Sequence, residues 1–291
     1  MRLRHIEVFH AIYTTGSITN AAQFLHVSQP SVSKVLAHAE QQLGFALFER
    51  VKGRLIPTSQ AEALFSEVDK VYKQIRGVRN TAENIKKSSS GHINIGFTPA
   101  LGFDLIPLVI SEFKKRYPGV HINLQTLHNE DVQQALMEHK LDLAIMFSPP
   151  PIANIIAIPL CKSEMVMVAP KPILPSQQTD IETSELAKHE LIGIWDSGPL
   201  GDLLWNRLSE NEVSVSSSIQ VQTYFIASRL VAQNIGVCVV DEFTARGNLT
   251  NDTDYAGFKP KLEFDVQALH LSDKPLSVNC QAFIDILMKQ V

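Results

Sequence analysis

Two short helical patterns joined by a tight break, within residues 18–35, constrain the fold of this chain more than any other feature. Ser17 can cap the first helix, whose apolar positions are Ile18, Ala21, Ala22 and Leu25. The second pattern begins with Ser28 as a cap and with Pro30 in its first turn, where the missing N–H costs nothing. Because small side chains let helices cross closely, the Ala21–Ala22 pair favours a helix-turn-helix of the kind that reads DNA. An ordinary helical hairpin with a solvated basic loop is the alternative.

A polar and basic outer face follows this pattern. Short polar side chains and Lys34 on the second helix could reach base edges and phosphates in a major groove. Residues 48–57 indicate a two-stranded wing that turns at Gly53 and carries basic side chains toward the phosphate backbone. The predicted DNA contacts are Thr19, Ser28, Gln29, Pro30, Ser31, Ser33, Lys34, Arg50, Lys52 and Arg54.

The charge is unevenly distributed along the chain. Residues 1–88 carry 12 Lys and Arg against 7 Asp and Glu, whereas residues 89–291 carry 14 against 23, within a net charge of −4. This asymmetry favours an anionic partner for the front of the chain only, although a basic segment is often just a solvated surface.

A long helical pattern without proline follows at residues 59–87. Its apolar stripe recurs in alternating steps of four and three, at Leu64, Val68, Val71, Ile75, Val78, Ala82 and Ile85. This is a coiled-coil repeat, and one helix cannot bury so narrow a stripe by itself. The stripe therefore pairs with a second copy or packs on its own domain, and the twofold symmetry of most DNA sites favours self-pairing. Residues 86–91 then indicate a helix end and a hinge.

From residue 92 onward, short apolar runs alternate with helical patterns. We expect strands at residues 93–97, 120–124, 141–146, 190–195, 219–221 and 237–240. Helices are expected at residues 101–116, 132–138, about 199–208 and 224–234. The alternation is typical of a parallel sheet flanked by helices, here in two similar α/β lobes with a cleft between them.

Ligands of open α/β sheets sit beyond the carboxyl ends of the strands, where helix N-termini offer free N–H groups. Thr98 and Ser197 lie at such places, although each is equally suited to plain helix capping. His128 is better suited to a surface or hydrogen-bonded position than to a ligand contact. The predicted contacts for a small molecule, called the effector, are Thr98, Pro99, Ala100, Leu101, His128, Phe147, Ser148, Trp195, Asp196, Ser197, Gln222 and Thr223. The acidic residues Asp104, Glu164 and Asp196 favour a cationic effector, such as a basic amino acid, an opine or an amine.

Enzymatic chemistry is not expected. The sequence has no nucleophile elbow, phosphate-binding loop or His-Glu-x-x-His motif, and its ten histidines are scattered. We predict no catalytic residues, no metal site and no cofactor. Three distant cysteines, no apolar run long enough to span a membrane and no secretion signal predict a cytoplasmic protein. The alternatives are a solute-binding or enzyme-like α/β protein with an incidental helical front, and a protein-interaction adaptor that uses the coiled coil.

The front segment resembles the N-terminal domain of LysR-type transcriptional regulators. The matching residues are Phe9, Gly16, Ser17, Ile18, Thr19, Ala21, Ala22, Leu25, residues 27–33, Glu40, Leu43, Gly44, Leu47, Phe48 and Arg50. Residues 3–7, 48–50 and 57–58 are similar to the branch that holds the lysine-biosynthesis and opine-catabolism activators. Most of the family has a glycine shortly after the position of Thr58, but the opine-type members lack it as this chain does. Residues 93–96, 105–107, 117–118, 141–145 and 230–237 resemble the two lobes of the family's effector domain.

The resemblance implies an α/β chain with an all-α front. Its expected parts are a winged helix-turn-helix at residues 1–58, a dimerising linker helix and hinge at 59–90, and a periplasmic-binding-protein-like effector domain at 91–291. Lobe one would comprise residues 91–161 plus 266–291, and lobe two residues 162–265. The implied partners are double-stranded DNA at a promoter operator, a small-molecule effector, a second copy through the linker helix, often a tetramer, and RNA polymerase. No membrane partner is implied.

Overall fold

The computed structural model describes residues 1–51, 54–87, 91–174, 180–194 and 198–291. The chain divides into two compact units, a front unit at Met1–Ala82 and a rear unit at Glu83–Val291. Each unit has its own hydrophobic core, and each is described by itself below.

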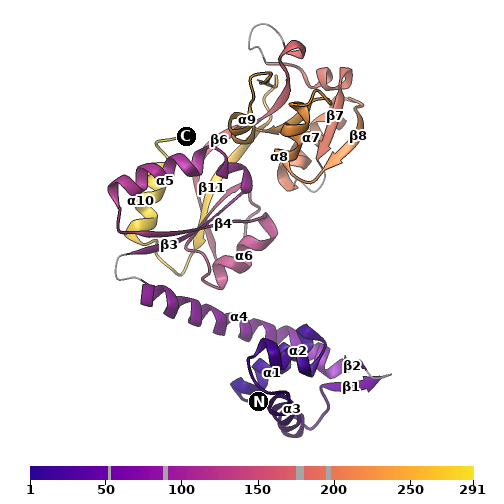
Figure 1. The fold of residues 1–291 in the computed structure, drawn as a ribbon, viewed down its shortest axis with the longest axis vertical. Helices are drawn as coiled ribbons and strands as arrows, with labels where there is room; N and C mark the ends of the chain where they lie inside the picture. Colours follow the sequence, from indigo (N-terminus) through magenta and orange to yellow (C-terminus); the bar gives the residue numbers. More distant parts are fainter. Residues whose placement is uncertain (52–53, 88–90, 175–179, 195–197) are drawn as a thin grey trace. The chain divides into compact units, whose positions relative to one another are not determined.

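The front unit contains the predicted helix-turn-helix and wing (Figure 1). Ala21 and Ala22 are buried where the second and third helices cross, and Ser17 accepts a hydrogen bond from the N–H of Asn20 at 3.5 Å. The predicted cap Ser28 precedes the third helix but makes no side-chain capping bond. The elements are α1 (Leu3–Thr15), α2 (Ile18–Phe24), α3 (Gln29–Leu43), β1 (Phe48–Val51), β2 (Arg54–Pro57) and α4 (Ser59–Lys87).

The first half of α4 packs against α1 through aromatic rings. Tyr13 stacks on Phe65 with 3.7 Å between ring centroids, and His10 stacks on Tyr72 at 4.0 Å. The apolar stripe divides accordingly, since Val68 is buried whereas Val71 and Val78 are 39% and 71% exposed. Part of the stripe therefore packs on its own unit, and part is left for another surface.

The rear unit is built on a seven-stranded sheet in the order β10-β6-β11-β5-β3-β4, with β9 paired to β6. Strands β3, β4 and β5 are parallel, but β6 and β11 run antiparallel to each other and to their other neighbours. The predicted parallel pairing therefore holds for β3, β4 and β5, but it is wrong for the strands paired with β6 and β11. The strands are β3 (His92–Phe97), β4 (His121–Thr126), β5 (Leu143–Phe147), β6 (Ile155–Pro170), β9 (Cys238–Asp241), β10 (Thr253–Gly257) and β11 (Glu263–Leu271).

Helices cover both faces of the part of this sheet formed by β3, β4 and β5, here called the first lobe (Figure 1). Alternate residues of β5 face opposite sides, so that Ile145 joins the core under α5 and α10 while Met146 joins the core under α6. The helices are η2 (Pro99–Gly102), α5 (Leu105–Arg116), α6 (Asn129–Met137) and α10 (Val278–Leu287). The helix predicted at residues 101–116 is therefore a short 3-10 turn followed by α5.

The second lobe gathers around β9, β10 and the far half of β6. A separate parallel pair, β7 (Glu190–Ile194) and β8 (Ser216–Val221), completes its strands. Its helices are η3 (Lys171–Ile173), η4 (Thr183–Lys188), α7 (Gly198–Glu210), α8 (Tyr224–Val231) and α9 (Glu242–Asn248). The chain passes between the lobes along β6 and β11. None of the helices described is long and apolar enough to cross a membrane.

Candidate functional site

The first turns of α3 present a polar surface that is free of the core. Gln29, Ser31 and Lys34 are exposed, and the Gln29 Nε2 donates to the half-buried Ser33 Oγ at 3.3 Å. Among the residues described, no carboxylate forms an ion pair with Lys34. The inner side of the same helix is held in the core by Val32 and Leu36. The predicted contacts Thr19, Ser28 and Pro30 are also exposed.

The wing presents arginines on both of its faces. Arg50 lies opposite Leu55, and Arg54 lies opposite Val51, in a regular antiparallel register. Because successive residues of a strand point to opposite faces, the two arginines project from opposite sides of the ribbon. A ribbon that enters a groove edge-on would direct one arginine toward each wall. Both are exposed and neither is paired with a described carboxylate, whereas Lys52 lies outside the described residues.

The effector residues predicted at the end of β3 are only partly accessible. Thr98 is half-buried, its N–H donates to the Ile145 carbonyl at 3.0 Å, and its hydroxyl donates to the Met146 Sδ at 3.7 Å. Ala100 and Leu101 are 4% and 0% exposed, so their side chains serve the core. Of this predicted group, Thr98 and Pro99 keep accessible side chains.

The effector residues predicted at the end of β5, Phe147 and Ser148, make contacts within the protein. Phe147 is 3% exposed and packs against the rings of Phe243 and Phe264. Ser148 exchanges two hydrogen bonds with the backbone of Asp265, so that its hydroxyl accepts at 3.1 Å and its N–H donates at 2.8 Å. These two residues join β5 to β11 at the crossing between the lobes.

Of the remaining predicted effector residues, some are exposed and others lie outside the described residues. His128 and Thr223 are exposed residues that precede α6 and α8 without making side-chain capping bonds, and Gln222 is exposed beside Thr223. The predicted contacts Trp195, Asp196 and Ser197 lie outside the described residues.

Asn129, which the sequence pattern did not single out, lies where the lobes approach. A Cβ atom on Gly198, the first residue of α7, would lie 4.0 Å from the Asn129 Nδ2. The Asn129 Oδ1 is buried without a hydrogen-bond partner among the described residues. The starts of α6 and α7 therefore approach each other here, and the free N–H groups of a helix start suit an anionic group. Glu130 and Asp131 in the first turn of α6 add negative charge beside it.

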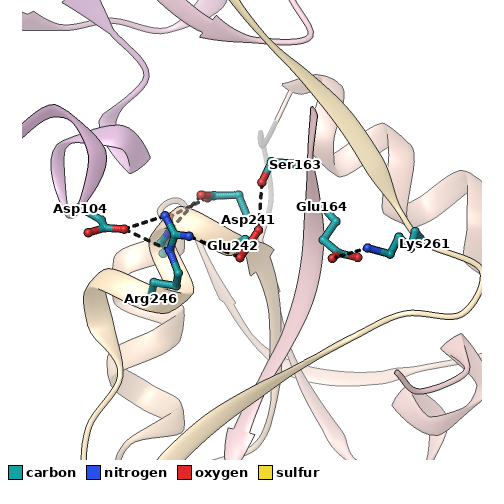
Figure 2. A network of polar contacts seen from close by, with 8 residues as sticks. Asp104, Ser163, Glu164, Asp241, Glu242, Arg246 and Lys261 are labelled. Atoms are coloured by element: carbon teal, nitrogen blue, oxygen red, sulfur yellow. Dashed lines mark hydrogen bonds and ion pairs between the residues drawn. The ribbon is translucent and has the colours of Figure 1, made fainter. Parts of the chain in front are cut away.

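A network of charged side chains connects the first turn of α5 with α9 (Figure 2). Two guanidinium N–H groups of Arg246 donate to the Asp104 Oδ2 at 2.8 and 3.1 Å. Arg246 also lies 3.6 Å from a Glu242 oxygen. Nearby, the Lys261 ammonium pairs with Glu164 at 3.0 Å. Two of the three predicted acidic residues thus have basic partners, so the acidic bias is smaller than the sequence suggested.

Phe103, which lies between η2 and α5, packs closely on α8 and α9. A Cβ on Gly247 would lie 2.5 Å from the Phe103 Cβ and 3.1 Å from its carbonyl carbon, so only glycine permits this approach. The ring of Phe103 stacks on Phe225 with 5.5 Å between centroids. Phe103, which follows η2 directly, thus contacts both α8 and α9 of the second lobe.

Asp241 anchors the start of α9 from within the core. It is fully buried, and its carboxylate accepts from the Thr244 N–H at 2.8 Å and from the Thr244 hydroxyl at 2.7 Å. Burial raises the pKa of Asp241 from 3.8 to about 6, although the hydrogen bonds from Thr244 oppose the shift.

This raised pKa predicts a pH dependence of the rear unit's stability. The folded state binds the Asp241 proton more tightly than the unfolded state, so this group stabilises the fold as pH falls from about 6 toward about 4. Between pH 7 and pH 5, we expect the native chain to gain about 1 kcal/mol relative to Asp241→Asn, which cannot titrate. Urea unfolding of both proteins at the two pH values measures this difference. An unchanged difference would show that Asp241 does not titrate in this range.

Comparisons with known proteins agree with both units. Residues 3–62 match the family "Bacterial regulatory helix-turn-helix protein, lysR family", and residues 86–291 match the family "LysR substrate binding domain". The chain belongs to the LysR family of transcriptional regulators. As a LysR-type regulator it is a DNA-binding protein with an effector-binding domain, and the family is not enzymatic.

Individual relatives support this membership. The LysR-type chain is 59% identical over 287 residues to the HTH-type transcriptional regulator DgcR of Pseudoalteromonas sp, covering 99% of both chains. It is 28% identical to the Transcriptional activator protein LysR of Escherichia coli K12, covering 97% of this chain and 91% of that protein. The full-length structure of CbnR complexed with target DNA covers 100% of both chains with a TM-score of 0.69, at 15% identity. At that identity the structure supports the fold alone.

Proposed function

We propose that this LysR-type regulator binds promoter operators through α3 and the wing, and that a small-molecule effector held between the two lobes controls this binding. The observation that carries the proposal is the exposed polar start of α3, with Lys34 unpaired among the described residues, above a helix crossing closed by Ala21 and Ala22. The DNA contacts proposed are the ten residues predicted above, from Thr19 to Arg54.

The proposed division of labour follows the boundaries expected from the sequence. Residues 1–58 bind DNA, residues 59–90 dimerise and act as a hinge, and residues 91–291 bind the effector. Exposed Val71 and Val78 on α4 support pairing of two copies, and two such dimers would form the proposed tetramer. Bound at a promoter, the protein would act in the cytoplasm and meet RNA polymerase.

We propose an effector with a cationic group and one carboxylate, such as a basic amino acid or an opine, or else an amine. The starts of α6 and α7 suit the carboxylate, and Glu130 and Asp131 suit the cation. Placement in the lysine-biosynthesis and opine-catabolism branch is proposed from the resemblance of residues 3–7, 48–50 and 57–58.

Titration calorimetry tests the effector class. Arginine, ornithine, lysine, opines and polyamines are titrated into the full chain, and at least one is expected to bind. Neutral amino acids, acidic amino acids and simple aromatic acids serve as the comparison set. Tight binding of an aromatic acid, together with no heat from any cationic compound, would contradict the proposed class while leaving the DNA-binding role intact.

Replacement of Lys34 tests whether the exposed start of α3 contacts DNA. We expect Lys34→Ala to lower DNA affinity on the order of tenfold and to lower the slope of log affinity against log salt by about 1 per bound subunit. Its melting temperature should stay native because Lys34 is exposed. Fluorescence anisotropy with duplex DNA over a salt series measures both quantities. Lys70→Ala, an exposed cation on α4, is the control, and native binding by Lys34→Ala would remove this residue from the interface.

A further inference from the structure

The peptide groups of Leu47, just before the wing, are held from two directions. Its side chain is fully buried, which fixes the residue in the core of the front unit. The Leu47 N–H donates to the Glu40 Oε1 at 2.8 Å, and the Phe48 N–H donates to the same oxygen at 3.2 Å. The Leu47 carbonyl accepts from the Thr58 N–H at 3.0 Å and from the Thr58 hydroxyl at 3.3 Å. The entrance and the exit of the wing thus meet at one residue.

Glu40 joins this point to α3. It lies in the last turn of the helix, and its carbonyl accepts from the Gly44 N–H at 2.9 Å, where the backbone turns with a φ of +78°. Its side chain then spans the turn to reach the first residue of β1. Among the described residues, no basic side chain forms an ion pair with Glu40. The hydrogen bonds that its carboxylate accepts come from the backbone at the base of the wing.

Thr58 joins the same point to α4. Its single hydroxyl proton is directed mainly to the Ala46 carbonyl at 2.8 Å and is shared with the Leu47 carbonyl, and its oxygen accepts from the Ala61 N–H at 3.2 Å, in the first turn of α4. Glu40 and Thr58 therefore connect the wing with the helix before it and with the helix after it.

We propose that Glu40 and Thr58 are positioning residues for DNA binding, which fix the wing and its arginines relative to α3 and α4. This inference rests on the proposed contacts of Arg50 and Arg54 with phosphates. Neither Glu40 nor Thr58 is assigned a DNA contact. Both residues act through the position of the wing. The wing and α3 contact phosphates of one duplex, so the wing arginines reach their phosphates only when the wing is held at the right distance from α3.

The salt dependence of binding to a random-sequence duplex tests the proposal with the full-length chain. Each phosphate contact contributes about 0.9 to the slope of log affinity against log salt. The variants Glu40→Ala and Thr58→Val remove the side-chain hydrogen bonds, whereas Glu40→Gln keeps an acceptor oxygen and Thr58→Ser keeps the hydroxyl. Each is measured in the native chain and in the Arg50→Ala/Arg54→Ala background, with melting temperatures recorded throughout.

We expect Glu40→Ala and Thr58→Val to reduce the slope of log affinity against log salt in the native chain. The reduction should be no larger than the one that Arg50→Ala/Arg54→Ala causes. In the background that lacks both arginines they should reduce it no further, and Glu40→Gln and Thr58→Ser should retain the native slope. A purely structural role would instead lower affinity equally in both backgrounds, and that result would overturn the proposal.

Two further outcomes separate this inference from the proposed function. If Arg50→Ala/Arg54→Ala leaves the slope native, the wing does not contact phosphates and both statements fail. If the arginine variant lowers the slope but neither Glu40→Ala nor Thr58→Val does, only the positioning role fails. Should Glu40→Ala unfold the front unit, the Thr58→Val and Thr58→Ser pair decides the question by the same criteria.

Discussion

The double variant Val71→Glu/Val78→Glu is expected to be monomeric and to lose about 100-fold or more in DNA affinity. Both valines lie on the apolar stripe of α4, and they are 39% and 71% exposed, whereas Val68 of the same stripe is buried within the front unit. Four glutamates brought together in a paired stripe would repel one another without any partner. With pairing lost, each chain binds a single half-site, and the gain from simultaneous binding disappears.

Sedimentation velocity measures the mass of this variant, and fluorescence anisotropy measures its DNA affinity. Both positions are exposed within a single chain, so the front unit should stay folded, and any fall in its melting temperature should reflect only the lost pairing. Ser66→Glu is the matched control, because Ser66 is exposed on a different face of α4. A double variant that sediments with the native mass would show that this stripe is not the dimer contact.

The second large effect is expected from Ala21→Leu, which should destabilise the helix-turn-helix and strongly weaken DNA binding. Ala21 is 0% exposed where α2 and α3 cross, and three added carbons cannot be accommodated without separating the helices. Overpacking of this kind costs about 1–3 kcal/mol, a large share of the stability of so small a unit. The loss of affinity follows because α3 no longer lies on a fixed support.

Calorimetric unfolding distinguishes this outcome from general damage. The rear unit has its own cores, so its transition should stay in place while that of the front unit moves to lower temperature. Gln23→Leu, an exposed position on the same helix, should leave both transitions and the DNA affinity native. Native melting and binding by Ala21→Leu would contradict the close helix crossing on which the reading surface depends.

The front unit could be predicted from sequence because its signals are local. Ser17, the Ala21–Ala22 pair and Pro30 each constrain a few neighbouring residues, and together they set the positions of α2 and α3. The wing was likewise recognisable from its turn. Part of the coiled-coil repeat in α4 packs on α1, because the aromatic residues Phe65 and Tyr72 also face that helix.

The long strands of the rear unit could not be recognised in the same way. Strand β6 covers 16 residues, contains Pro159 and changes its burial pattern where it passes between the lobes. Proline within a run argues against a strand, but here Pro159 lies beside an irregularity in the pairing with β11. The pairing of β6 with β11 joins residues about a hundred positions apart in the sequence. A local sequence pattern cannot predict such a pairing.

Candidate effector residues were harder to predict than DNA contacts for a physical reason. The side chain of a residue at or just after the end of a strand can point into the core or into the cleft. The sequence did not show that the side chains of Leu101 and Phe147 are buried in the core. The helix that begins at Asn129 was expected only from residue 132, where its apolar pattern starts, so Asn129 was missed. The ion pair between Asp104 and Arg246 joins positions 142 apart in sequence.

Selection from sheared genomic DNA of the organism that encodes this chain tests the central claim most directly. The full chain and Lys34→Ala are incubated with the fragments at moderate salt, and the bound fragments are sequenced. We predict that the native chain enriches fragments that share a twofold-symmetric sequence, with half-sites separated by whole helical turns, and that Lys34→Ala enriches them much less. Failure of the native chain to enrich any sequence, even at low salt, would contradict its assignment as an operator-binding regulator.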